Sequence, residues 1–155
     1  MKKILFDCGT RDVTASLGLL VLRLCIGLMM LIGHGIPKLQ GYATMKDGWP
    51  VPPMWPLSTM SPPVSLIATI GAELFCSLLI ILGLGTRFAA FILGFAMVVA
   101  AFNAHGQDPW FMSAAGGAKE PALLYLIPML VLIITGAGAT SFDAALYRDA
   151  KRRRW

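Results

Sequence analysis

Four long apolar runs separate the polar segments of this chain. They cover about residues 17–36, 64–84, 88–105 and 121–139, and each approaches the roughly 20 residues with which a helix crosses a bilayer. Apolar residues fill these runs instead of forming one amphipathic stripe, as is typical of helices surrounded by lipid. The pattern therefore predicts an all-α integral membrane four-helix bundle, a single domain over residues 1–155.

Prolines and glycines mark the expected helix ends. The pair at 62–63 suits a first turn, Gly83 suits the end of the second helix, and Thr86 is the expected N-cap of the third. Gly136 should end the fourth helix, and Pro128 should kink it, which membrane helices tolerate. The second and third runs are so close in sequence that they must form an antiparallel hairpin.

The segment 37–63 between the first two runs has a different composition. It holds seven of the ten prolines and two of the four tryptophans. We interpret it as a long Pro/Trp-rich outer loop that forms a stiff cap on the membrane surface, too rich in proline for helix.

The last segment, 141–155, predicts a short basic interfacial helix. Ser141 can cap it, and Asp143 suits its positive N-terminal end. Phe142, Ala145 and Leu146 share one face, and the chain then closes on a basic tail.

Composition and charge distribution support the membrane assignment and add an orientation. Hydrophobic residues make up 57% of the chain and charged residues 14%, against about 25% charged in soluble domains. With four spans, nine lysines and arginines fall on the side of the two tails and three on the other. This bias predicts a multi-pass protein of the cell inner membrane, with a retained first helix and both termini cytoplasmic. Contact with anionic lipid headgroups explains the basic tail, so nucleic-acid binding is not expected.

The three cysteines indicate no redox or metal chemistry of their own. Cys8, Cys25 and Cys76 form no CxxC pair and no zinc-ligand spacing. Neither a disulfide framework nor a metal site is expected, and Cys25 and Cys76 should act as small hydrophobic residues.

Arg23 is the first ionisable residue inside a predicted span. Helical spacing places it on one face with His34 and Lys38, and this face should look into the bundle. Two interpretations stay open: an internal ion pair, or a side chain that reaches back to the cytoplasmic interface.

Glu73 is the sharpest signal, because it lies near the middle of the second run with no neighbouring cation in sequence. A carboxyl at that depth must be paired, hydrogen-bonded or protonated. It is either a structural hydrogen bond between helices or a proton-handling group, and we expect its contacts toward the outer histidines instead of Arg23.

Further polar residues lie where the runs meet the outer side. His34, Lys38, His105 and Glu120 can converge there above Glu73, and Asn103, a candidate charge-balancing or substrate residue, is close to His105 in sequence. Ordinary interfacial residues would give the same pattern. Two histidines are weak evidence for haem, and no haem or covalently bound cofactor is expected.

Several of these residues stand in motifs that resemble the DoxX family. The motifs follow Arg23 in the order GHGIPKL at 33–39, Glu73, LGLGTR at 82–87, EPALLY at 120–125 and GAGATSFD at 136–143. Each is loose alone, but their order and spacing are fairly specific. The long loop at 37–63 departs from the family pattern.

The resemblance implies a four-helix membrane protein linked to oxidoreductase complexes, including the small subunit of thiosulfate:quinone oxidoreductase and thiol-stress complexes. The leading hypothesis is therefore a membrane oxidoreductase subunit passing electrons from a small sulfur or thiol donor to quinone. Glu73, His34 and His105 would handle protons, with Arg23 or Lys38 balancing charge.

Two further hypotheses use the same residues differently. One is a transport protein for a small solute, and the other is a scaffold without chemistry that recruits soluble redox enzymes. Because the sequence has no nucleotide fingerprint and no redox cysteine pair, electrons would come from a soluble partner protein or from the substrate. A homo-oligomer is compatible with the sequence.

Overall fold

The computed structural model describes residues 9–10, 12–112 and 117–152, with side chains described as far as Tyr147. Within these residues the chain forms helices and loops and no strand. Cys8 and most of the basic residues on which the predicted orientation depends lie outside the described side chains.

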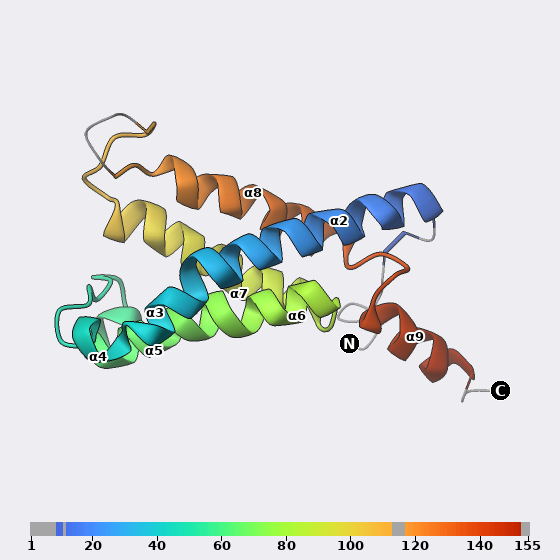
Figure 1. Cartoon of the computed structure of the whole chain (residues 1–155), viewed down its shortest axis with the longest axis horizontal. Coiled ribbons are helices and arrows are strands. Elements are labelled where there is room, and N and C mark those ends of the chain that lie inside the picture. Colours follow the sequence, from blue (N-terminus) through green and yellow to red (C-terminus); the bar gives the residue numbers. More distant parts are fainter. Residues whose placement is uncertain (1–8, 11, 113–116, 153–155) are drawn as a thin grey trace.

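Four rods of helix lie along the long axis of the molecule (Figure 1). The first rod consists of α2 (Val13–Met30), η1 (Leu31–Gly35) and α3 (Ile36–Gln40), and the second of α5 (Pro62–Ile70), η3 (Gly71–Phe75) and α6 (Cys76–Leu82). The third rod consists of α7 (Thr86–Val99) and η4 (Ala100–Ala104), and the fourth is α8 (Glu120–Thr135). The first three rods are long and apolar enough to cross a membrane by length and composition, whereas α8 is apolar but shorter.

Shorter elements close the two ends of the bundle. One end, which we call the loop end, holds α4 (Tyr42–Met45), the turn η2 (Leu57–Thr59) and the link between η4 and α8. The other, the tail end, holds the α6–α7 turn, residues 136–141 and α9 (Phe142–Arg152), which projects beyond the rods in Figure 1.

The first rod is longer than the predicted run 17–36, because proline does not end it. The wider π-turn η1 ends two residues before Pro37, and the Ile36 N–H bonds to the Leu31 carbonyl five residues back. A π-turn relieves the clash between a proline ring and the preceding turn, so helix continues to Gln40. The prediction that segment 37–63 contains no helix was therefore wrong.

The other helix boundaries differ from the predicted ones by a few residues. The second rod ends at Leu82, where Gly83 adopts a left-handed φ of +69°. The fourth ends at Thr135 instead of 139, because Gly136, with a φ of +77°, turns the chain away. Pro128 lies inside α8, as predicted.

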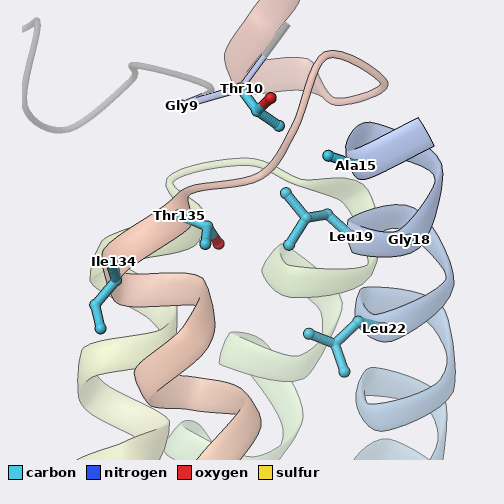
Figure 2. A pocket seen from close by; sticks show the side chains of 8 residues that line it. All are labelled: Gly9, Thr10, Ala15, Gly18, Leu19, Leu22, Ile134 and Thr135. Atoms are coloured by element: carbon cyan, nitrogen blue, oxygen red, sulfur yellow. The ribbon is translucent and has the colours of Figure 1, made fainter. Parts of the chain in front are cut away.

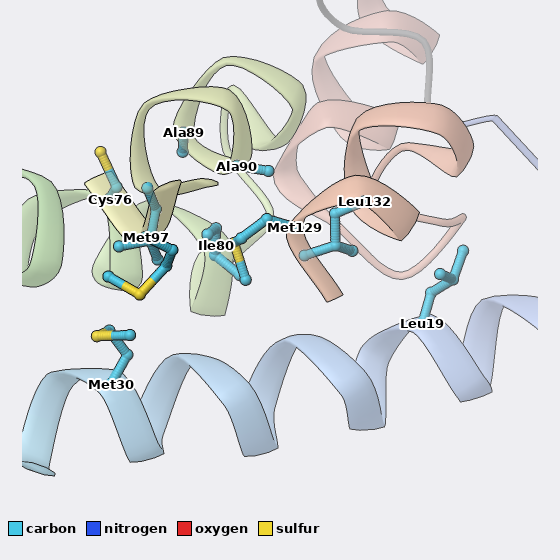
Figure 3. Close-up of a cluster of buried hydrophobic side chains, with 10 residues drawn as sticks. Leu19, Met30, Cys76, Ile80, Ala89, Ala90, Met97, Met129 and Leu132 are labelled. Carbon is cyan, nitrogen blue, oxygen red and sulfur yellow. The ribbon is translucent and has the colours of Figure 1, made fainter. Parts of the chain in front are cut away.

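Small residues allow the rods to approach closely, as is usual between membrane helices. A Cβ on Gly27 of α2 would lie 2.6 Å from the Ile81 side chain of α6, and one on Gly94 of α7 would lie 3.2 Å from Cβ of Met129. The core between the rods includes Met30, Ile80 and Met129 (Figure 3). Larger apolar side chains such as Phe91 remain exposed on the outside, where lipid would cover them.

The tail end is held by a buried carboxylate. Asp143 accepts hydrogen bonds from the backbone N–H groups of Gly85 (2.7 Å) and Thr86 (3.0 Å), and its own N–H donates to the Gly83 carbonyl. The predicted N-cap, Thr86, is thus the first residue of α7, and a side chain from α9 caps that helix in its place. The cap of α9 itself is Ser141, whose Oγ accepts from the Ala144 N–H, as predicted.

Candidate functional site

Three π-turns lie toward the loop end of the long rods, two within a rod and the third at the end of one. They are η1, η3 and η4, and they carry His34, Glu73 and Asn103 respectively. η1 and η3 touch through their backbones, since a Cβ on Gly35 would lie 3.1 Å from the Glu73 carbonyl oxygen. Single π-turns in long helices occur frequently at functional sites, because the extra residue redirects side chains.

An ion pair joins the first two rods at these turns. The Lys38 Nζ donates to Oε2 of Glu73 at 2.5 Å, and the two side chains are only 19% and 6% exposed. Lys38 stands one helical turn after His34, so η1 and α3 present both side chains to η3. The buried charge at Glu73 is thereby compensated by Lys38.

His34 and Tyr125 complete this group, which we call the Lys38–Glu73 cluster. Their rings meet edge to face, with centroids 5.3 Å apart and an interplanar angle of 85°. His34 stands one helical turn before Lys38 on the first rod, and Tyr125 lies on α8. The cluster therefore brings together an ammonium, a carboxylate, an imidazole and a phenol from three rods.

Arg23 belongs to the opposite end of the bundle. Its guanidinium is fully buried and donates to the carbonyl oxygens of Thr140 (2.7 Å), Ile80 and Ile81 (both 3.5 Å). It therefore holds the C-terminal end of α6 and the 136–141 segment, where a cation suits the exposed carbonyls. Among the described residues it makes no ion pair with Glu73.

His105 makes its polar contact outside the Lys38–Glu73 cluster. Its Nδ1 lies 2.8 Å from Oδ2 of Asp108, in the turn that follows η4. Nearby, Lys119 donates to the backbone carbonyls of Gly106 and Asp108 and lies 5.4 Å from the Trp110 ring centroid. These local contacts form a second group at the loop end.

The outer polar residues therefore make their hydrogen bonds in separate groups. Glu120, at the start of α8, accepts from the backbone N–H of Met112 and so belongs to the link before α8. Asn103 stands on η4 next to the second group. Sequence spacing gives depth along a helix but not the rotation of one helix about another, so residues at one depth can face different neighbours.

Tyr125, Asp108 and Asp143 were missed as site or capping residues. Tyr125 is the one tyrosine inside a predicted span, which could have singled it out. Asp143 was assigned to the start of its own helix, because nothing in the local sequence indicates that it caps α7.

The cluster offers no ready metal site. No group of three or more histidine, cysteine, aspartate or glutamate side chains arranged to hold a metal occurs within the described part of the chain. Cys25 is exposed on α2 and Cys76 is buried in the core, and both are free thiols.

The comparison with known families now bears on this arrangement, since the DoxX family profile matches residues 18–106, more than half of the chain. The chain belongs to the DoxX family. The matched region contains Arg23 and three of the four residues of the Lys38–Glu73 cluster, and with the three long apolar rods it indicates a membrane protein.

Two uncharacterised proteins of Haemophilus influenzae are similar to this DoxX protein. One is 28% identical over 152 residues, which cover 96% of each chain. The other is 33% identical over 129 residues, which cover 82% of this chain and 89% of that one. No solved structure matches the chain significantly.

Proposed function

We propose that this protein is the membrane subunit of a quinone-linked redox system, in which a small sulfur or thiol donor reduces quinone. The observation that carries the proposal is the buried Lys38–Glu73 ion pair beside His34 and Tyr125. Family membership supports the link to quinone oxidoreductases.

The chemistry of quinone reduction fits the groups in the cluster. Quinone takes up two electrons and two protons, and two thiols that join in a disulfide release the same number, so 2 RSH + Q gives RSSR + QH2. Lys38 and Tyr125 carry hydrogen-bond donors for the quinone oxygens, and Glu73 and His34 can pass protons. A soluble redox partner is the alternative source of the electrons.

The packing between the two polar ends favours this function over solute transport. The buried side chains of Met30, Cys76 and Ile80 lie in the core between the rods, on the stretch of chain from the Lys38–Glu73 cluster to Arg23 (Figure 3). A permeation pathway would need polar groups along that stretch, whereas the buried side chain of Ser77, the polar one there, is bonded to the Glu73 carbonyl.

The proposal includes a location and a topology. All four rods cross the inner membrane, and the tail end faces the cytoplasm, as the lysine and arginine distribution suggests. The 16 residues of α8 span only about 24 Å. However, α8 packs along α7, and the Arg87 guanidinium of α7 donates to the Ile133 carbonyl near the C-terminal end of α8.

Exchange of one carboxyl for an amide tests the function. Membranes holding the wild-type protein should reduce a quinone analogue when a thiol or thiosulfate is added, and Glu73→Gln should lose most of that rate while still inserting. The matched control is Glu120→Gln, since that carboxylate binds the Met112 N–H outside the cluster. Full activity of Glu73→Gln would leave the carboxyl a purely structural role and refute the proposal. Wild-type membranes without activity would favour a scaffold.

A further inference from the structure

An apolar groove lies between α2 and α8 at the tail end (Figure 2). It has a volume of 650 Å³ and lies open to the outside. Its lining consists of Ala15, Gly18, Leu19 and Leu22 of α2, Ile134 and Thr135 of α8, and Gly9 and Thr10 of the segment before α2. The side-chain polar groups among these eight residues are the hydroxyls of Thr10 and Thr135, and no lining residue is charged, so the groove suits mainly hydrocarbon.

One of the lining residues is a glycine. A Cβ built on Gly18 would meet no atom within 4 Å, so there is open space for a side chain at this position. Leu19 and Leu22 extend from α2 toward α8 and form the floor (Figure 2).

The groove and the Lys38–Glu73 cluster occupy the two ends of one helix–helix seam. At the loop end, α2 and η1 meet α8 where His34 contacts Tyr125. At the tail end the same two rods line the groove. Tyr125 and Ile134 stand nine residues apart on α8, which corresponds to about 14 Å along the helix.

We propose that this groove receives the isoprenoid tail of the quinone, with the quinone ring held at His34 and Tyr125. The inference rests on the proposed function and adds an orientation: the ring lies toward the loop end, and the tail runs along the α2–α8 seam toward the tail end. Burial of a hydrocarbon tail would contribute affinity in proportion to its length, independently of the polar contacts to the ring.

Filling the groove tests the inference. Gly18→Leu places a side chain in the open space without a clash in the structure. We expect it to raise KM for a quinone with a long isoprenoid tail at least fivefold, with kcat unchanged, and to leave KM for a tail-free quinone unaltered. Leu17→Phe is the matched control, because this substitution adds bulk at an exposed position of the same turn that does not line the groove. Equal KM changes for the two quinones would overturn the inference.

A binding measurement separates this inference from the redox function. A long-tailed quinone analogue with a photoreactive group at the tail end should label Leu22 or Ile134 in the wild-type protein and not in Gly18→Leu. Labelling without thiol-dependent turnover would retain the tail site and refute the redox function. Turnover without groove labelling, or labelling by a photoreactive phospholipid that excess quinone does not displace, would refute the tail site.

Discussion

At the scale of single residues, the Lys38–Glu73 pair combines structural and chemical roles. Both charges are largely removed from solvent, and each compensates the other. Loss of one partner leaves an unpaired buried charge, which costs about 3–5 kcal/mol in proteins, whereas apolar replacement of both partners is often neutral. The two roles can therefore be separated by mutation.

We predict that Glu73→Leu or Lys38→Met alone lowers the unfolding temperature in detergent strongly, and that the double variant recovers most of the loss. The physical reason is the removal of the second unpaired charge. Quinone reduction should stay absent in the double variant, because the protonatable group is gone. Thermal unfolding followed by circular dichroism measures the first effect. Additive losses in the double variant would show that the two side chains do not interact.

At the scale of elements, the π-turns place the cluster by bringing two backbones together. Gly35 of η1 lies against the Glu73 carbonyl, where a Cβ would be 3.1 Å from that oxygen and from Leu74 Cα. Both neighbours are backbone atoms, so they cannot move without displacing η3. Nearby Gly33 is exposed and would meet nothing within 4 Å.

We therefore expect Gly35→Ala to lower the unfolding temperature and to impair quinone reduction, because it pushes η1 from η3 and lengthens the Lys38–Glu73 contact. Gly33→Ala, in the same π-turn, should leave both properties close to wild type. The two variants differ only in whether the added methyl group meets another rod. If both behave alike, helix propensity rather than the close approach governs this turn.

The α6–α7 turn depends on a cap from outside its own sequence. Asp143 binds two free N–H groups at the start of α7 and is almost fully buried. We predict that Asp143→Ala destabilises the protein by about 1–3 kcal/mol, since those donors would stay buried without a partner.

Asp12→Ala provides the comparison for Asp143→Ala. Asp12 also caps a helix, through the Ala15 N–H, but it is exposed, so water can replace it. Its loss should cost less than the loss of Asp143 in a denaturant titration. A larger effect at Asp12 would contradict the assignment of the buried cap.

The sequence predicted what depends on local pattern and missed what depends on helix rotation. The apolar runs located all four rods, and the depth of Glu73 together with the direction of helical side chains favoured partners on the outer side over Arg23. Lys38 was assigned only a general charge-balancing role, and its pairing with Glu73 requires the register of α3 against η3. The helix also continues past Pro37 because of a π-turn, and the spacing of residues in the sequence does not predict such a turn.

At the scale of the whole molecule, the two ends of the bundle carry different polar groups. The loop end holds the Lys38–Glu73 cluster and the His105–Asp108 contact, and the tail end holds Arg23 and Asp143. An apolar core lies between the rods. This division gives the bundle a direction, so its orientation in the membrane decides which compartment exchanges protons with the cluster.

The proposed topology predicts which positions a membrane-impermeant thiol reagent can reach in intact cells. Single cysteines at Met45, at Gly117 and at Arg152 would be placed in a variant whose three native cysteines are serine. That background should fold, because Cys25 is exposed on α2 and Cys76 packs as a small hydrophobic side chain.

Positions 45 and 117 stand at the loop end, before and after α5–α7, and position 152 follows α8. If all four rods cross and the tail end is cytoplasmic, the reagent should modify the first two and spare the third until the cells are opened. Modification of position 152 together with 45 and 117 would mean that α8 does not cross, and modification of 152 alone would reverse the orientation. The short α8 makes this comparison decisive, because its 16 residues alone fall below the length that spans a bilayer.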